Sequence, residues 1–395
     1  MGTSAIQQRE STSAKLKQTK AEKLLGNSDV KRWYDNMARG SPLTAEVRLR
    51  RLCHFCEVHT ITPAQLVDLA TRDLATATNL LQDHIAWMEE KENAPGYIRN
   101  TLTAVRSWLN HSDIQVRRRL KVADADSTPT LEEERVPEGA ELAEIFNRAT
   151  MRAATIISLM SKAGLRPEVL GNYNATDGLM MKDLPDIVIQ QGVARCLVSP
   201  PRVIVRKTLS KTKHQYFTFL TGQGTRKLLA SLNDRLARGE SLNGESPVVA
   251  PNLEYRAFRG KNAGKRFLPT RRICNDVRDT FRPRFKWRPY VLRSYFDTQL
   301  LIAESRGKIA HDFRVFFMGH KGSIEAKYTT NKGVLPEALL NEMREAFRRC
   351  ETFLDLEISE EDPLIKQKDR LQSIIEKATP ERMQEMLRAL GVCNT

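Results

Sequence analysis

The first third of the chain alternates apolar and polar positions with the period of an α-helix. Ser41-Pro42 and Thr62-Pro63 each place a capping residue before a proline, which is the signature of a helix start. Two further helices are expected over residues 80–88 and 97–109, the latter with one apolar face. Together these segments predict a compact all-α domain over residues 28–122.

Segments without this periodicity flank the domain. Residues 1–27 are polar and rich in Lys, Ser and Thr, which predicts a flexible basic tail. Residues 123–137 combine acidic residues, Ser and Pro with few large apolar side chains, so we expect a linker there. Residues 359–395 predict an amphipathic, acidic helical tail that could dock in cis or on a neighbouring subunit.

Residues 138–358 predict a second domain, mainly α with a small antiparallel β-hairpin. Residues 202–206 and 215–220 alternate in the manner of strands and flank a polar, basic turn at 207–214, a pattern typical of a hairpin. Residues 187–189 also favour a strand. Helices are expected over residues 141–146, 153–162, 224–238, 270–281, 293–304 and 336–353.

The charge balance favours a polyanionic partner. Lys+Arg number 63 against 48 Asp+Glu, a formal net charge of +15. The excess is central, because residues 187–233 contain no Asp or Glu while residues 351–395 are acidic. We therefore expect the middle of the chain to meet the polyanion, with the basic segment 240–290 adding phosphate contacts.

Cysteine usage and hydropathy exclude several classes of protein. The 6 cysteines follow no disulfide-like framework, as expected in a reducing cytosol. Cys53-His-Phe-Cys56 with His59 nearby has the spacing of half a zinc site. Because no second half follows, two faces of a helix are the preferred interpretation, and we expect no metal. No apolar run approaches ~18 residues and no signal peptide is visible, so we expect a soluble intracellular protein without a membrane partner.

Two arginines are expected at half-buried helix ends. Arg166 follows an apolar helix in Gly164-Leu-Arg, and Arg293 opens another helix in Val-Leu-Arg. An unpaired buried charge is costly, so each arginine needs an anion. Glu168 could provide an ordinary salt bridge for Arg166. Alternatively, two guanidiniums can hold both non-bridging oxygens of one phosphodiester.

Residues 316–329 contain a candidate nucleophile. Met318-Gly319 forms a small-residue turn before His320, and a helical stretch then presents Tyr328 close to Lys327. A tyrosine near histidine and lysine in a basic chain suggests a phenol that attacks phosphate. The plain alternative is an ordinary tyrosine on a surface helix, and the upstream arginines favour the chemical interpretation.

Taken in order, these residues resemble the tyrosine recombinases, or phage-type integrases. The order is an Arg in Gly-Leu-Arg, a Lys on a β-hairpin, a Leu-Arg pair, Gly-His and then Tyr. Residues 288–293 and 318–323 extend the resemblance to integrase-like proteins of archaea and their mobile elements. The resemblance implies that residues 28–122 form a core-binding, SAM-like domain and residues 138–358 an α+β catalytic domain.

The resemblance also implies roles for single residues. Arg166 and Arg293 would clamp the scissile phosphate, and His320 would hydrogen-bond it. Tyr328 would attack phosphorus to form a 3′-phosphotyrosyl enzyme. Lys211 would protonate the 5′-oxygen leaving group, with Lys213 and Lys207 as alternatives. Since this chemistry conserves the phosphodiester bond energy, it implies no cofactor, neither ATP nor a metal.

Three features depart from the family pattern. Tyr290 stands where the family has His or Lys three residues before the second arginine, so a phenol would contact the phosphate there. Glu168, the acidic residue after the first arginine, comes one position early. The spacing from His320 to Tyr328 is one residue shorter than in bacterial members, a rotation of about 100° if that stretch is helical.

The partner implied by the resemblance is double-stranded DNA. A homo-tetramer would act on two DNA sites through a Holliday junction, and the free protein could be a monomer, in the cytoplasm and on the nucleoid when bound. Contacts with DNA are expected from Arg117, Arg118, Arg119, Lys121, Arg206, Lys207, Lys213, His214 and Lys321. Two rivals stay open: a type IB topoisomerase, and a non-cleaving DNA-binding protein on a decayed integrase scaffold.

Overall fold

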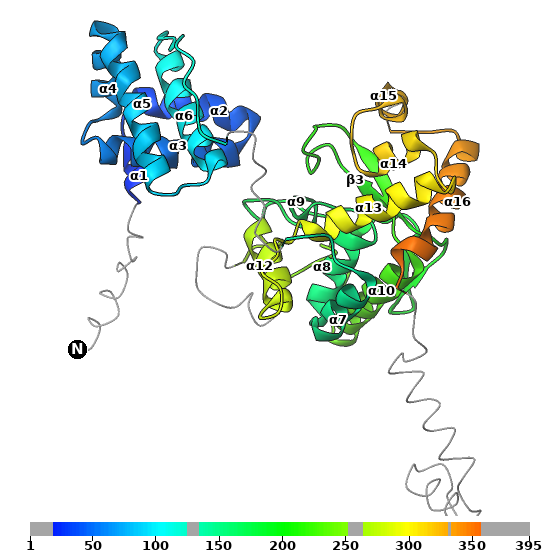
Figure 1. Cartoon of the computed structure of the whole chain (residues 1–395). Helices are drawn as coiled ribbons and strands as arrows, with labels where there is room; N and C mark the ends of the chain where they lie inside the picture. The colour runs from blue at the N-terminus through cyan, green and yellow to red at the C-terminus, as the bar shows by residue number, and fades with distance from the viewer. Residues whose placement is uncertain (1–18, 125–133, 252–263, 331–332, 357–395) are drawn as a thin grey trace, which may run out of the picture. The chain divides into compact units, whose positions relative to one another are not determined.

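The chain forms two compact units, Met1–Thr130 and Leu131–Thr395 (Figure 1). A computed structural model describes residues 19–124, 134–251, 264–330 and 333–356. Across these residues no helix combines the length and the hydropathy that a membrane span requires. The tail predicted at residues 359–395 lies outside the described residues.

The first unit is all-α. Its helices are α1 (Lys20–Leu24), α2 (Ser28–Gly40), α3 (Pro42–Val58), α4 (Pro63–Arg72), α5 (Leu74–Glu90) and α6 (Pro95–His111). Both capped helix starts predicted from the sequence are confirmed, since the Ser41 and Thr62 side chains accept hydrogen bonds from Thr44 and Gln65 N–H. Helix α1 lies within the predicted tail. The sequence did not predict this helix because it contains few apolar residues. Two of them, Ala21 and Leu24, nevertheless pack against the core of the unit.

Helices α2, α3, α5 and α6 enclose the core of this unit. Trp33 and Trp108 meet edge to face with ring centroids 5.7 Å apart, and Trp108 Nε1 donates to the Pro63 carbonyl at 3.0 Å. Cys53 and Cys56 are buried on α3. Among the described residues, no group of three His, Cys, Asp or Glu side chains could hold a metal ion. The helix-face interpretation of these cysteines fits this packing.

A histidine pair is buried in the same core. His59 Nε2 and His84 Nδ1 share a hydrogen bond of 3.0 Å, and His84 stacks on Trp87. Burial, together with repulsion from His59 and His54, lowers the pKa of His84 to about 4. Burial also lowers the pKa of His59. Folding therefore favours the neutral form of both histidines.

The second unit is mainly helical with two small antiparallel sheets, the fold class predicted from the sequence. Strand β1 (Ile187–Gln190) pairs with β2 (Val193–Cys196), and β3 (Arg202–Val205) pairs with β4 (Tyr216–Phe219). The β3–β4 hairpin is the predicted one. Its helices are α7 (Gly139–Arg148), α8 (Met151–Ser161), α9 (Pro167–Leu170), α10 (Gly222–Ala237), α12 (Thr270–Phe281), α13 (Val291–Ser305), α14 (His311–Phe317), α15 (Ser323–Thr330) and α16 (Glu337–Leu354), with a 3₁₀ turn at Met181–Asp183.

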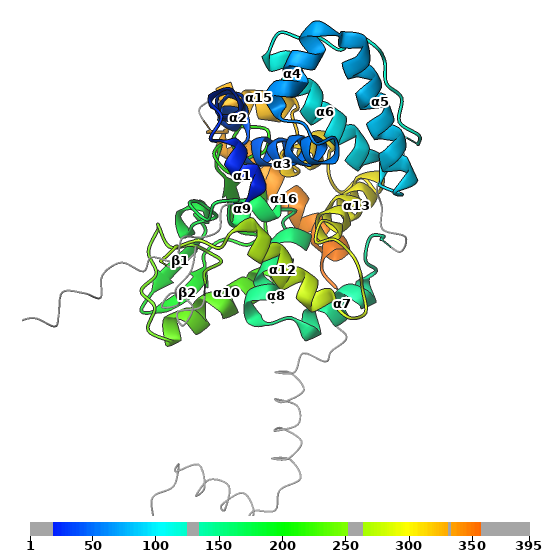
Figure 2. The ribbon, with the colours of Figure 1, turned by 90° about the vertical axis from the view of Figure 1, so that its left-hand side faces the viewer.

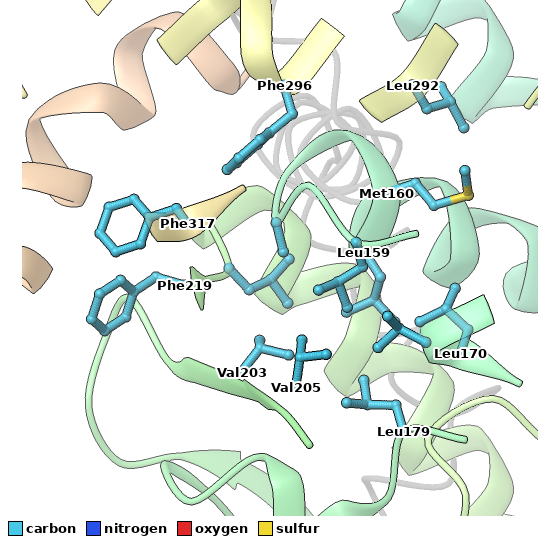
Figure 3. Close-up of a cluster of buried hydrophobic side chains, with 14 of the residues drawn as sticks. Leu159, Met160, Leu170, Leu179, Val203, Val205, Phe219, Leu292, Phe296 and Phe317 are labelled. Carbon is cyan, nitrogen blue, oxygen red and sulfur yellow. The ribbon is translucent and has the colours of Figure 1, made fainter. Parts of the chain in front are cut away.

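Helix α8 is the centre of this unit. Every residue from Ala153 to Ser161 is buried, because α10, α12 and α13 pack around the helix, and Figure 2 shows α12 beside it. Figure 3 shows Leu159 and Met160 among side chains of the β3–β4 hairpin and of α13. The buried hydroxyls of Thr155 and Ser161 donate to carbonyls of the same helix, so α8 can be buried on all sides and provides a rigid base for the segment that follows it.

Helix α16 packs against α13 of the same unit, and its last residue is hydrogen-bonded to Lys162, which directly follows α8. Lys162 is fully buried, and its ammonium group donates to the Leu354 carbonyl, which also accepts from Tyr295 Oη at 3.2 Å. Burial lowers the pKa of Lys162 to about 8, although the negative charge of Asp355 raises it. Asp355 in turn accepts hydrogen bonds from Thr221 Oγ1 and the Gln223 N–H at the start of α10.

The histidine pair predicts acid sensitivity of the first unit. Unfolded His84 has a pKa near 6.5 and folded His84 near 4, so the unfolded state binds more protons between these values. The free energy of unfolding should therefore fall by about 3 kcal/mol as the pH drops from 6.5 to 4. Urea unfolding followed by tryptophan fluorescence reports on this unit, which holds Trp33, Trp87 and Trp108 of the 4 tryptophans.

A matched pair of variants isolates the effect. His84→Gln keeps a hydrogen-bonding group beside His59 but removes the titration, so most of the loss between pH 6.5 and 4 should vanish. His111→Gln removes an exposed histidine of the same unit and should leave the loss unchanged. Equal pH profiles for the wild type and His84→Gln would show that the buried pair does not govern acid stability.

Candidate catalytic site

Arg293 joins two separate segments of the second unit. It is the third residue of α13, its side chain is 0% exposed, and its two terminal nitrogens donate to the backbone carbonyls of Gly164 and Met318. These carbonyls belong to the Gly-Leu-Arg segment and to the turn before His320. Arg293 thereby fixes the positions of both Arg166 and His320, and Figure 1 shows α9, α13, α14 and β3 in one part of the unit.

Arg166 lies at the surface end of this arrangement. Gly164 turns the chain after α8 with φ +66°, and a Cβ there would lie 2.4 Å from the Phe296 ring. Arg166 then caps α9 and is half-buried. The salt bridge that Glu168 could have provided does not form: Glu168 is exposed, and no ion pair joins Arg166 to any other described residue. Its charge is therefore available to an anion.

His320 completes a cluster with the two arginines. Gly319, with φ +62°, ends the turn after α14, and His320 follows it at the surface. Partial burial lowers the pKa of His320, and the charges of Arg293 and Arg166 lower it further. Burial likewise lowers the pKa of Arg293, with repulsion from Arg166 adding to the effect. The three side chains thus lie close enough to influence one another.

The tip of the β3–β4 hairpin is attached to the same turn. Thr212 Oγ1 donates to the Gly319 carbonyl at 3.3 Å and lies 3.0 Å from Ser210 Oγ. Lys211 and Lys213, on either side of Thr212, are exposed. The predicted general acid and its neighbour are therefore carried beside His320. Their ammonium groups stay free to move because only Thr212 is fastened.

Tyr290 forms the rim of the cluster. It precedes α13 and is 51% exposed, an unusual exposure for a large aromatic side chain. Its side chain lies near Arg293: burial lowers the pKa of Arg293, whereas Tyr290 raises it. A contact from Tyr290 to phosphate stays a prediction.

Tyr328 is present on the expected helix, α15, but it is buried. Its side chain is 3% exposed and lies between the rings of Phe217 and Phe316, each 5.6 Å away between centroids. Its hydroxyl accepts a hydrogen bond of 3.0 Å from Gln215 Nε2. The sequence predicted an accessible nucleophile, whereas the structure holds the phenol in the core with a partner. Attack on phosphate would require α15 to move.

The other predicted DNA contacts differ in their surroundings. Arg206 is bound within the unit by Asp183 at 3.0 Å and by Asp177 at 2.8 Å, so a structural role accounts for it. His214 is buried, whereas Lys207 and Lys321 are exposed. The four contacts predicted in the first unit, Arg117, Arg118, Arg119 and Lys121, are all exposed.

Sequence reasoning missed a basic groove in the first unit. Arg119 and Lys121 line it together with Arg99 and Arg106 of α6, around a volume of about 1000 Å³. The spacing of Arg99 and Arg106, seven residues apart on one helix, placed them on one face and was the available signal. Tyr216 and Gln215 were also missed, because their strand was interpreted only as apolar alternation.

Gly319 offers a test of the turn that carries His320. A Cβ at this position would lie 2.5 Å from two ring carbons of Tyr216, in addition to the strain of φ +62°. Gly307 has a similar φ of +69° but nothing within 4 Å of its Cβ position. Gly307→Ala should therefore cost about 1–2 kcal/mol of unfolding free energy through strain alone. Gly319→Ala should cost roughly 1–3 kcal/mol more, as measured by urea unfolding. Equal costs would show that the ring does not press on the turn.

Comparisons with known proteins give fold neighbours only. No family model matches the chain, and no curated protein matches it. Among solved structures, XerA recombinase is 17% identical, with 80% of this chain and 96% of that chain covered and a TM-score of 0.33. XerH site-specific recombinase bound to difH substrate, pre-cleavage, is 14% identical, with 83% and 96% covered and a TM-score of 0.38. Its post-cleavage complex with palindromic difH substrate is 14% identical, with 77% and 78% covered and a TM-score of 0.38.

Proposed function

We propose that this chain is a tyrosine-type site-specific DNA recombinase that cuts and rejoins strands through a 3′-phosphotyrosyl intermediate. One observation carries the proposal: Arg293 holds Arg166 and His320 in one cluster beside a hairpin tip with exposed lysines. Such a set of donors suits a phosphodiester, whose charge grows as a fifth bond to phosphorus forms. Double-stranded DNA would be the substrate, and a homo-tetramer on two sites would exchange strands through a Holliday junction.

The roles follow from the positions of the side chains. Arg166, half-buried and without an ion-pair partner among the described residues, would bind a non-bridging oxygen. His320 and Tyr290 lie at the surface of the cluster and would add hydrogen bonds. The terminal nitrogens of Arg293 already hold the two backbone carbonyls and would position the cluster, which leaves Nε of Arg293 as its donor to the phosphate.

The chemical step moves one bond to phosphorus. Tyr328 Oη attacks phosphorus and gives its proton to solvent water, the bond from phosphorus to the 5′-oxygen breaks, and Lys211 protonates that oxygen. Rejoining reverses these events with a 5′-hydroxyl from another strand. The number of phosphodiester bonds is conserved, so the reaction needs no external energy source.

Trapping of the covalent intermediate tests the proposal. Duplexes that bind the protein are first selected from a random pool and are then nicked beside each possible cleavage position, so that the cut strand cannot be rejoined. The wild type should form a covalent adduct that survives denaturing electrophoresis, and Tyr328→Phe should form none. Tyr173→Phe, a variant of a partly exposed tyrosine of the same unit, should match the wild type.

Each alternative outcome identifies a rival. Tight binding without an adduct would support a non-cleaving DNA-binding protein. Relaxation of any supercoiled plasmid without preference for the selected sites would support a type IB topoisomerase.

The buried state of Tyr328 predicts a second effect. Gln215→Leu removes the hydrogen bond to the Tyr328 hydroxyl, worth about 0.5–1.5 kcal/mol in net free energy. If release of α15 limits cleavage, the rate of adduct formation should rise roughly 2- to 10-fold under single-turnover conditions. Gln223→Leu, which alters a contact to the Leu356 N–H instead, serves as the control. An unchanged rate in Gln215→Leu would show that the hydrogen bond does not restrain the nucleophile.

A further inference from the structure

Tyr216 lies directly beneath the turn that carries His320. It opens strand β4 and is 1% exposed. Its ring faces the Cα of Gly319 so closely that a Cβ there would lie 2.5 Å from Cε1 and Cζ. The hydroxyl, attached to Cζ, is therefore at the contact between the hairpin and the turn. This is the place where Arg293 and the segment of Met318 also meet.

The Tyr216 hydroxyl is buried without a hydrogen-bond partner among the described residues, and so is Nε of Arg293. A buried polar group that lacks a partner costs about 1–3 kcal/mol, and native structures contain few of them. Two such donors in one cluster therefore point to an acceptor that is absent from the free protein.

Apolar packing alone does not account for the hydroxyl. Phe217 and Phe219, the next aromatic residues of the same strand, fill the core with plain phenyl rings that meet Phe316 and Phe317 edge to face. A phenylalanine at position 216 would pack against Gly319 equally well and would leave no orphaned oxygen.

The charges around Tyr216 select the type of acceptor. Burial and the charge of Arg166 lower the pKa of Arg293, whereas Tyr216 raises it. Tyr216 therefore lies within electrostatic reach of the Arg293 guanidinium. With two arginines at hand, an anionic oxygen is the acceptor that compensates both orphaned donors.

We propose that Tyr216 is a further catalytic residue, whose hydroxyl donates a hydrogen bond to a non-bridging oxygen of the phosphate bound between Arg166, Arg293 and His320. This role rests on the proposed function. Tyr216 donates but does not attack: no covalent bond to it forms, and Tyr328 stays the nucleophile. The bond strengthens as the non-bridging oxygens gain charge during attack, so Tyr216 contributes more to the rate than to DNA affinity.

Tyr216→Phe tests the role, because it keeps the ring on Gly319 and removes only the oxygen. Single-turnover adduct formation should slow by about 10²-fold, with DNA affinity nearly unchanged. Thermal stability of the free protein should rise or stay the same, since an unpaired buried hydroxyl is lost. Tyr295→Phe is the matched control: it also removes a buried hydroxyl, but one bonded to the Leu354 carbonyl, and should lower stability without slowing cleavage.

Modified DNA separates a catalytic role from a structural one. In a methylphosphonate substrate, a methyl group replaces one non-bridging oxygen of the scissile phosphate. For the isomer that lacks the oxygen bound by Tyr216, the wild type and Tyr216→Phe should cleave at equal rates. Equal rates on unmodified DNA would overturn the inference. So would an undiminished difference on both methylphosphonate isomers, which would indicate a structural defect.

A binding measurement keeps the inference testable apart from cleavage. If the wild type forms no adduct with any selected DNA, the proposed function fails, and the phosphate contact is then judged with inorganic phosphate. Phosphate should raise the melting temperature of the wild type, and Tyr216→Phe should bind it about tenfold more weakly. Identical stabilisation of both proteins, or of neither, would overturn the contact.

Discussion

The hydrogen bonds from Arg293 to the Gly164 and Met318 carbonyls are the interaction on which the rest of the site depends. A guanidinium buried this deeply is tolerated because rigid elements present acceptors to it: α8 fixes the Gly164 end, and α14 fixes the Met318 end. Once these bonds are in place, Arg166 and His320 have little freedom to separate. The geometry of the proposed site is therefore a property of the packed core and not of surface loops.

Two arginines of the second unit differ in whether a carboxylate of the fold pairs with them. Arg206 is enclosed by Asp177 and Asp183, and these carboxylates satisfy it completely within the fold. Arg166 is half-buried yet has no ion pair with a described residue, although Glu168 is two residues away. A fold that neutralises one half-buried arginine and leaves another without an ion pair among the described residues fits the phosphate contact proposed for Arg166.

Much of the fold could be predicted because its signals are local. Ser41-Pro42, Thr62-Pro63 and the alternation on either side of residues 207–214 depend on neighbours in the sequence, and the structure confirms each of them. Strand β2 was missed because Val193-Ala-Arg-Cys196 does not alternate apolar and polar side chains. The burial of Tyr328 could not be predicted, since it depends on rings from β4 and α14 that are distant in the sequence. The order of the candidate site residues can be read from the sequence, whereas the exposure of each side chain depends on the folded structure.

The linkage made by Arg293 has an evolutionary consequence. Its two acceptors are main-chain carbonyls, which every amino acid supplies, so substitutions in the segments around Gly164 and Met318 need not break it. Only the arginine side chain and the glycines with positive φ are constrained at this point. Sequences that share this arrangement can therefore drift far apart while the spatial relation of their reactive groups stays the same.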